Sequence, residues 1–461
     1  MRRFATARPA AGRSHRVPPG IVTRTRIASL ALPLVVAVGM LAGCGGGGGS
    51  TSTTAAIPGV PLDTCANVEY GGDGTPQALI VSDLPMQGDS AERSRQQVDA
   101  IRLVLDQRGW KAGQVAVAFQ ACDDSIAKTG LWDPATCRAN AAGYAKDEKV
   151  LGVIGTYISG CAAEEVPILN KAGLAMISPG NTAVCLTEST PNCEDGQPAS
   201  LYPTGQRNYA RVVPNDAFQG AALADFAKQQ GTARPFVLYA ADDPTSTGQA
   251  TNFRGAAQAL GMNIAGFETW NAKAGDYRGL FAKVKRSGAD AIVLAGLIEE
   301  NGAQVIRDKV GALGSNAKLP LIAFDGFAQQ STIDRAGAAS RDMFASVPGR
   351  APENLTGDGA TLVQDLKGEI GDQPVEQFAP YAGEAAAVMS DAIATAGPDR
   401  AGVVKAVFAT HGGGILGDYR IEPSGDPSVG PITVLKAGTT FVPDREVTPQ
   451  PQLVSAARGG G

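Results

Sequence analysis

The amino-acid sequence predicts an α/β protein with two doubly wound, Rossmann-like lobes joined by a multi-strand hinge. Short β-rich runs alternate with longer helical runs from Gln77 onward, and the alternation restarts after Pro214. This repetition is typical of parallel sheets covered by helices on both faces. The chain has 461 residues, which is longer than a typical single domain. Further elements follow the second set of runs, so we expect the chain to cross between the lobes more than once.

In the first lobe, strands and helices alternate regularly. Strands are expected at Ala78–Asp83, Val115–Phe119, Val150–Tyr157 and Leu174–Ser178, and helices at Ala91–Arg108, Ala135–Lys146 and Cys161–Lys171. The first of these helices carries apolar residues at an amphipathic spacing, among them Val98, Ile101 and Leu105.

The second lobe repeats this pattern, and later elements return to the first lobe. Its expected strands are Phe236–Ala240, Ile264–Thr269, Ala291–Leu297, Leu321–Phe324 and Met343–Val347, and its helices are Phe218–Gln229, Gly248–Leu260, Tyr277–Arg286, Ala303–Val310 and Gln329–Ala336. Helices at Ala360–Glu369, Glu384–Ala396 and Gly402–Ala409 and strands at Asp418–Ile421 and Ile432–Lys436 follow. We therefore assign residues 76–213 and 349–428 to lobe 1, and residues 214–348 and 429–442 to lobe 2.

Residues 1–43 have the features of a bacterial lipoprotein signal peptide. Seven arginines and no acidic residue precede an apolar run, Ile27–Leu41, which ends in Leu41-Ala42-Gly43-Cys44. About 15 apolar residues are too few for a comfortable membrane span, which takes roughly 20. The sequence therefore predicts export and a lipid on Cys44 that anchors the protein to the outer face of the cytoplasmic membrane. An ordinary signal peptide with an accidental cysteine is the alternative.

Two polar segments flank the predicted lobes. The Gly-rich and Ser/Thr-rich residues after Cys44 predict a flexible tether over 44–75. The Pro-containing, Gly-ended residues 443–461 predict a disordered tail.

The charge of the processed chain argues against two classes of partner. Removing the seven signal arginines from the 40 basic residues leaves 33 against 45 acidic residues, a formal charge of −12. An acidic protein is not expected to bind nucleic acid, or to adhere to a membrane surface by its own charge. Contact with the membrane is therefore expected only through the lipid.

Six cysteines remain besides the lipidated one. They are Cys65, Cys122, Cys137, Cys161, Cys185 and Cys193. An even number in an exported chain predicts disulfides, whose connectivity the sequence leaves open. Cys185–Cys193 is the most plausible local pair because it would close a polar loop. A zinc site is the rival interpretation, disfavoured because CxxC pairs are absent and the processed chain has one histidine.

The segment from Val150 to Thr182 carries the most specific signal. It reads VLGVIGTYISGCAAEEVPILNKAGLAMISPGNT, which predicts strand, turn, helix, strand and turn, with Ser159 where the helix begins. Free N–H groups at a helix start favour a carboxylate, and both turns follow strand ends at which open α/β sheets bind ligands. The pattern resembles the periplasmic Leu/Ile/Val-binding protein family, the type I solute receptors of ABC importers, here as an actinobacterial-type lipoprotein.

The resemblance implies an amino-acid site between the lobes. Ser159 and Thr182 would hold the ligand carboxylate, and the carbonyl of Gly180, beside Asn181, would accept from the ligand ammonium. In the second lobe, Asp325 stands where the family places an acidic residue against that ammonium.

The side-chain half of the pocket departs from the family pattern. Thr247 and Leu297 stand where relatives often have aromatic residues, and Gln87 would line the entrance. Specificity for branched-chain amino acids therefore does not follow, and amides or other small polar organic molecules are further candidate ligands.

Each of these residues also has a purely structural interpretation. Ser159 could serve only as a helix cap, and Gly180 and Thr182 could be plain turn residues. Asp325 could be a solvated carboxylate at a strand end. The adjacent pairs Asp123-Asp124 and Asp242-Asp243 are interpreted as loop charges, since neighbours on an extended segment point to opposite sides.

No enzyme, cofactor or metal site is predicted. His411 is the single histidine of the processed chain and is interpreted as a helix-terminal surface residue, and the sequence has no GxSxG, HExxH or P-loop motif. We expect the two lobes to close on a small solute and a membrane permease to recognise the closed form. A sensor lipoprotein that signals to a membrane partner is the alternative, and a hydrolase is a third hypothesis.

Overall fold

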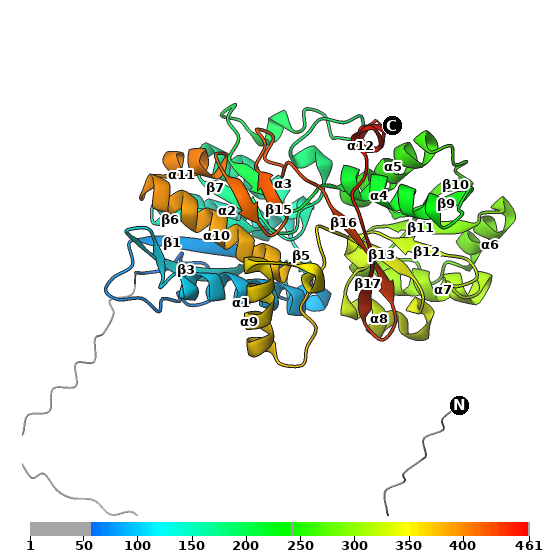
Figure 1. Cartoon of the computed structure of the whole chain (residues 1–461), viewed down its shortest axis with the longest axis horizontal. Helices are drawn as coiled ribbons and strands as arrows, with labels where there is room; N and C mark the ends of the chain where they lie inside the picture. Colours follow the sequence, from blue (N-terminus) through cyan, green and yellow to red (C-terminus); the bar gives the residue numbers. More distant parts are fainter. Residues whose placement is uncertain (1–56, 242, 460–461) are drawn as a thin grey trace, which may run out of the picture. The chain divides into compact units, whose positions relative to one another are not determined.

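Two β-sheets organise the part of the chain that the computed structural model describes, residues 57–241 and 243–459. The first sheet has the strand order β2-β3-β1-β6-β7-β8, and the second has the order β10-β9-β11-β12-β13-β16-β17. Each sheet is the centre of one α/β lobe (Figure 1). The predicted fold class of two doubly wound α/β lobes is confirmed.

Lobe 1 is built on a strand that is buried along its whole length. All seven residues of β1, Ala78–Leu84, are buried, because helices cover both faces of its sheet. The strands beside it are β2 (Lys111–Ala112), β3 (Val115–Asp123), β6 (Val150–Gly155), β7 (Ala175–Ser178) and β8 (Tyr209–Arg211), all parallel except β2. One face packs on α1 (Ala91–Gln107), α9 (Asp358–Ile370), α10 (Ala379–Ala396) and α11 (Arg400–Val407), and the other on α2 (Pro134–Lys146) and α3 (Ser159–Lys171).

Lobe 2 repeats this arrangement with an antiparallel edge. Its strands are β9 (Pro235–Ala240), β10 (Gly266–Trp270), β11 (Ala291–Ala295), β12 (Leu321–Ala323), β13 (Phe344–Pro348), β16 (Ile432–Ala437) and β17 (Phe441–Val447). Strand β16 pairs antiparallel with both β13 and β17. One face packs on α6 (Arg278–Ser287), α7 (Ala303–Leu313) and α8 (Gln330–Ala336), and the other on α4 (Asp216–Gln229), α5 (Pro244–Ala259) and α12 (Pro451–Arg458).

The chain passes between the sheets three times. The first crossing joins β8 to α4 through residues 212–215, and the second joins β13 to α9 through residues 349–357. The third crossing, residues 421–431, follows the hairpin β14 (His411–Gly414) and β15 (Gly417–Arg420) and leads to β16. Within the hairpin, His411 is exposed at the start of a strand rather than at a helix end.

The prediction of a disordered tail over 443–461 is wrong for most of its length. β17 pairs with β16, and α12 buries Val454 and Ala457 against the lobe 2 core. The Pro and charged residues of this segment are compatible with a strand because β17 lies at the sheet edge, where one side makes no ladder bonds.

The predicted tether over 44–75 is also too long. Ile57 and Val60 are buried against lobe 1, and Cys65 forms a disulfide with Cys122 of β3. Cys44 and the signal peptide lie outside the described residues. Any tether therefore ends before Ile57.

Two further disulfides lie in lobe 1. Cys137 of α2 is joined to Cys161 of α3, and Cys185 is joined to Cys193, the local pair that the sequence favours. These bonds use all six cysteines, so the zinc interpretation is wrong for them.

The interpretation of Asp124 as a loop charge is wrong. β3 runs to Asp123, and the next carboxylate turns inward to lie fully buried near Asp83 and Glu165. Asp243 is not a free loop charge either, because it accepts the N–H groups of Thr245 and Ser246 as the N-cap of α5.

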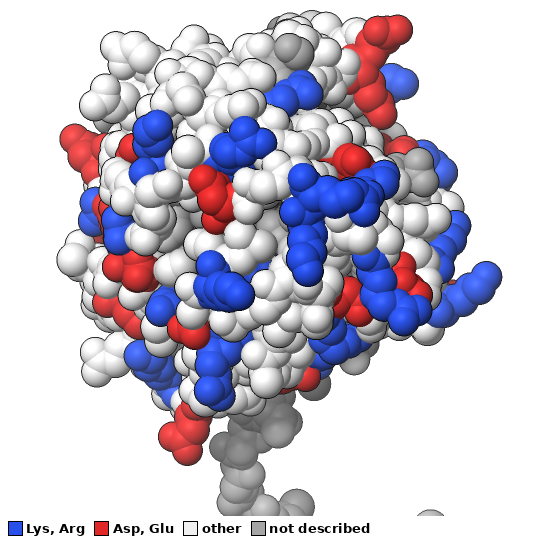
Figure 2. All heavy atoms as spheres, turned by 90° about the vertical axis from the view of Figure 1, so that its right-hand side faces the viewer, with Lys and Arg blue, Asp and Glu red and all other residues white. Residues whose placement is uncertain are grey.

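Charged side chains of both signs cover the face of lobe 2 in Figure 2. α6 contributes exposed Arg278, Lys283, Lys285 and Arg286. Ion pairs join Arg278 to Asp276 and Lys283 to Glu268. Among the described residues, no helix combines the length and apolar character needed to cross a membrane.

Candidate ligand site between the lobes

The two turns singled out in the sequence meet at Ser159. Its side chain is buried, and Oγ accepts the N–H groups of Thr182 and Ala183, each at 3.2 Å. The N-cap of α3 is Ile158, which has no capping side-chain bond. Ser159 therefore holds the neighbouring turn instead of capping its own helix.

Lobe 2 approaches this turn through the start of α4. The N–H of Asp216 donates to the carbonyl of Thr182 at 2.8 Å. Gln219 Nε2 donates to Oδ1 of Asp216 at 2.9 Å and to Oδ1 of Asp325 at 3.0 Å. Gln249 Nε2 donates to the same two oxygens at 3.3 and 3.1 Å. Two buried carboxylates are thus held side by side by two amides, next to the turn of lobe 1.

The electrostatics of this pair favour a positively charged guest. Burial raises the pKa of Asp216 well above its usual range, and the negative charge of Asp325 raises it further. Burial also raises the pKa of Asp325, against the lowering effects of the Gln219 hydrogen bond and the Arg93 charge. Oδ2 of Asp216 has no hydrogen-bond partner within the described chain. A cation placed between the carboxylates would restore their ionised form.

Other predicted site residues have different surroundings. The side chain of Asn181 is bonded within lobe 1, where Nδ2 donates to Thr156 and Oδ1 accepts from Tyr209, and its assignment to the pocket stays a prediction. Gln87 donates to Asp123 at 2.7 Å, and none of its bonds joins it to Ser159 or Asp325.

The remaining three predicted residues, Gly180, Leu297 and Thr247, each contact neighbours within their own lobe. A Cβ on Gly180 would lie 2.7 Å from the ring of Tyr157, so the turn packs tightly there. Leu297 contacts the position of Gly326, beside Asp325. Thr247 is half-buried in the first turns of α5 and donates to the carbonyl of Asp243.

The structure adds a buried arginine that the sequence analysis missed. Arg93 of α1 is 1% exposed and lies against the rings of Tyr157 and Phe378. It donates to the Tyr157 hydroxyl, pairs with Glu376 at 3.4 Å and reaches across to the carbonyl of Ala328 in lobe 2 at 2.8 Å. An amphipathic helix pattern gives no sign that a particular arginine is buried, so the sequence offered no signal for it.

Two cavities lie beside residues other than Ser159. A cavity of about 60 Å³ adjoins Arg93 through the two partners Ala328 and Glu376. A groove of about 1060 Å³ lies elsewhere on lobe 1, between α9, α10 and the β14–β15 hairpin.

The sequence of this chain matches a family of known function. A family model described as periplasmic binding protein matches residues 84–437. The chain belongs to this family. It is therefore a periplasmic binding protein with the two-lobed fold of that family, and it is a binding protein rather than an enzyme.

Individual relatives of this binding protein are distant but cover it well. A Leu/Ile/Val-binding protein homolog 2 from Brucella abortus (strain 2308) is 24% identical over 383 residues, 81% of this chain and 93% of the relative. The crystal structure of a leucine binding protein, LivK, from Thermotoga maritima MSB8 matches with a TM-score of 0.69 at 22% identity, over 81% of this chain and 99% of that one. A solute binding protein from R. palustris, in complex with benzoate, matches with a TM-score of 0.65 at 17% identity, over 80% and 96%.

Proposed function

We propose that this binding protein is the receptor of an ABC importer, anchored outside the membrane by a lipid on Cys44, and that its lobes close on an α-amino acid. The names of the Brucella and Thermotoga relatives support an amino-acid ligand. The proposed lobes are residues 76–213 with 349–428 and residues 214–348 with 429–442. A permease in the membrane is the proposed partner of the closed form.

In this proposal the two lobes hold opposite ends of the ligand. The carboxylate accepts from the Ser159 hydroxyl and shares with Ser159 Oγ the N–H of Thr182. The ammonium lies near the carbonyl of Gly180 and between Asp216 and Asp325. Charge-assisted hydrogen bonds in a water-poor site fix both ends. The charge of the ammonium also lowers the raised pKa values of the two carboxylates and so favours their ionised state.

One observation supports the proposal most strongly. Asp216 donates its N–H to the carbonyl of Thr182 while its carboxylate is bridged to Asp325. A pair of buried acids with one unpartnered oxygen therefore lies beside the amides that would hold a carboxylate. This spacing of acids and amide N–H groups suits a small zwitterion.

An aromatic carboxylate is the second candidate ligand. Arg93 lies between two aromatic rings at the lobe contact, 5.1 Å from the centroid of Tyr157 and 5.2 Å from that of Phe378. A planar acid could replace one of these stacking contacts and pair with the guanidinium. The similarity in fold to the benzoate complex is consistent with this candidate.

A thermal-shift panel separates the two candidates. L-leucine, L-isoleucine, L-lysine, benzoate and 4-hydroxybenzoate are compared on the wild type and on Asp325→Asn. The proposal expects an amino acid to raise Tm and Asp325→Asn to remove that shift, while the exposed control Asp334→Asn retains it. A shift from benzoate that persists in Asp325→Asn would favour the second candidate, and the absence of any shift would count against both.

A further inference from the structure

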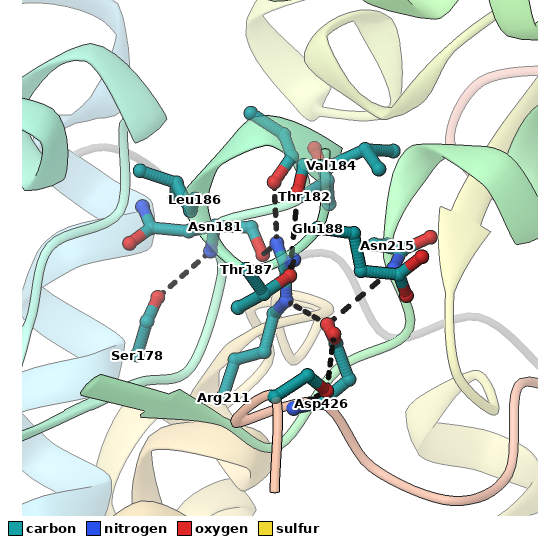
Figure 3. Close-up of polar contacts among 12 residues, drawn as sticks. Ser178, Asn181, Thr182, Val184, Leu186, Thr187, Glu188, Arg211, Asn215 and Asp426 are labelled. Atoms are coloured by element: carbon teal, nitrogen blue, oxygen red, sulfur yellow. Dashed lines mark hydrogen bonds and ion pairs between the residues drawn. The ribbon is translucent and has the colours of Figure 1, made fainter. Parts of the chain in front are cut away.

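The carbonyl groups on either side of Thr182 are held by one buried arginine (Figure 3). Arg211 is the last residue of β8 and is fully buried. Its Nη1 donates to the carbonyl of Asn181 at 3.1 Å and to that of Ala183 at 2.9 Å. Its Nη2 donates to Thr187 Oγ1 at 2.6 Å, further along the same loop.

The bond to the Asn181 carbonyl determines where the N–H of Thr182 points, and the bond to the Ala183 carbonyl holds the far end of the unit that carries the N–H of Ala183. In a trans peptide unit the C=O and N–H groups point in opposite directions. Because the carbonyl of Asn181 faces Arg211, the N–H of Thr182 faces the other way, toward Ser159 Oγ at 3.2 Å. A cation at the carbonyl oxygen also polarises the peptide unit and strengthens its N–H as a donor.

The arginine is itself held by the third crossing between the lobes. Nε donates to Oδ1 of Asp426 at 2.7 Å, and Asn215 of the first crossing donates to the same oxygen at 3.4 Å. Burial raises the pKa of Asp426, but the Arg211 charge and hydrogen bonds from its neighbours outweigh burial, so the pKa is lowered. The pair therefore stays ionised although both side chains are buried.

The backbone brings the crossing close enough for this ion pair. The N–H of Arg211 donates to the carbonyl of Gly425 at 2.9 Å. Gly425 has φ of 100°, and a Cβ there would lie 2.3 Å from the carbonyl oxygen of Tyr209. A glycine is required at this approach because any side chain would push the crossing, and Asp426 with it, away from β8.

We propose that Arg211 is the positioning residue of the carboxylate half of the site. It acts without touching the ligand, by turning the N–H of Thr182 toward Ser159, against which the ligand carboxylate would lie. Asp426 ties this orientation to the third crossing between the lobes. The role of these amides as ligand donors rests on the proposed function. Their orientation by Arg211 is a property of the ligand-free protein.

Amide hydrogen exchange in the ligand-free protein tests this role directly. Arg211→Lys keeps the charge but cannot hold two carbonyls and Asp426 in one plane. We expect exchange at Thr182 and Ala183 to become at least tenfold faster, with exchange in β6 unchanged. Arg207→Lys is the matched control, because Arg207 contacts the same loop at the carbonyl of Thr187 and stacks on Tyr202. Unchanged exchange at the two amides, or equal acceleration throughout β6, would contradict the proposal.

Asp426→Asn provides a second variant that keeps the arginine. It weakens the hold on Arg211, so a smaller acceleration at the same two amides is expected. If Arg211→Lys does not fold, this variant decides the question, and unchanged exchange in it contradicts the proposal.

A ligand comparison separates this inference from the proposed function. L-leucine is compared with L-leucinamide, which lacks the carboxylate. Arg211→Lys should reduce the preference for L-leucine over L-leucinamide about tenfold, whereas general loosening would weaken both equally. If the wild type binds neither compound while the exchange effect is present, the proposed function fails and the inference on Arg211 stands.

Discussion

The N–H of Asp216 donates to the carbonyl of Thr182 at 2.8 Å, so the first helix of lobe 2 is hydrogen-bonded to the ligand turn of lobe 1. The carboxylate of Asp216 and its partner Asp325 therefore stand at a fixed place relative to the amides that Ser159 holds. The two ends of the proposed site are connected through the protein before any ligand arrives.

Replacing either buried carboxylate with its amide should remove binding without unfolding the protein. Asp216→Asn and Asp325→Asn keep the shape of the side chain but abolish its charge. We expect each to weaken amino-acid affinity at least 100-fold in calorimetric titration, since a buried ammonium loses its counter-charge. Stability should be unchanged or higher, because the unpartnered oxygen of Asp216 costs free energy in the ligand-free form. Tm values lower by more than about 10 °C would indicate a structural role instead.

The buried acids of lobe 1 should make stability fall as pH rises. Burial raises the folded-state pKa of Asp83 to about 6, partly offset by polar neighbours, among them Asn140, which donates to Oδ1. The native state therefore holds a proton that the unfolded chain releases near pH 4. This contribution is fully present below about pH 4 and is lost as pH rises through about 6, an effect of about 3 kcal/mol.

Asp124 and Glu165 should extend this loss to higher pH. Burial raises the pKa of both well above the usual range, and the charge of Asp83 raises each further. Urea unfolding from pH 4.5 to 8 measures the slope, and Glu165→Gln should make it shallower. If the variant and the wild type have the same slope, the cluster does not hold its protons as described.

The C-terminal helix should contribute measurably to folding. Val454 is 3% exposed and packs against the core of lobe 2. Val454→Ala should lower the free energy of unfolding by about 1–3 kcal/mol, and the exposed neighbour Gln452→Ala should change it by less than about 0.5 kcal/mol. Equal stabilities of the two variants would mean that α12 is detached in solution.

Arg93 should stabilise contact between the lobes for every ligand. It donates from α1 to the carbonyl of Ala328 in lobe 2, so Arg93→Met removes an interlobe bond. We expect affinity for an amino acid to fall about tenfold, with association slower, and the free energy of unfolding of the unliganded protein to fall too, because Glu376 loses its buried partner. A selective loss of benzoate binding, with amino-acid binding retained, would instead assign Arg93 to an aromatic acid.

The sequence predicted the sheets well because their strands are buried on both sides. Runs such as Ala78–Asp83 and Ala291–Leu297 correspond to β1 and β11 within a few residues, since central parallel strands read as continuous apolar segments. β17 was missed because it is an edge strand with alternating exposure and a proline, which resembles a loop in sequence.

The site was predicted only where it depends on turns. Ser159 and Thr182 follow strand ends, so their convergence could be expected from the topology. Asp216 and Arg93 lie on helices, and burial of a helical charged residue depends on what packs against it from a distant segment. Tertiary contacts also decide which carbonyl groups Arg211 binds and why the Asp124 side chain is buried. No local sequence pattern encodes such contacts.

The central claim is that the site holds both charged ends of one zwitterion. Titration with analogues that each lack one of the two charges tests this claim most directly. The amino acid with the largest thermal shift is compared by calorimetry with its amide, which lacks the carboxylate, and with its 2-hydroxy acid, which lacks the ammonium. The account predicts that each analogue binds at least 100-fold more weakly than the parent. A hydroxy acid that binds as tightly as the amino acid would contradict it, because Asp216 and Asp325 would then face no cation.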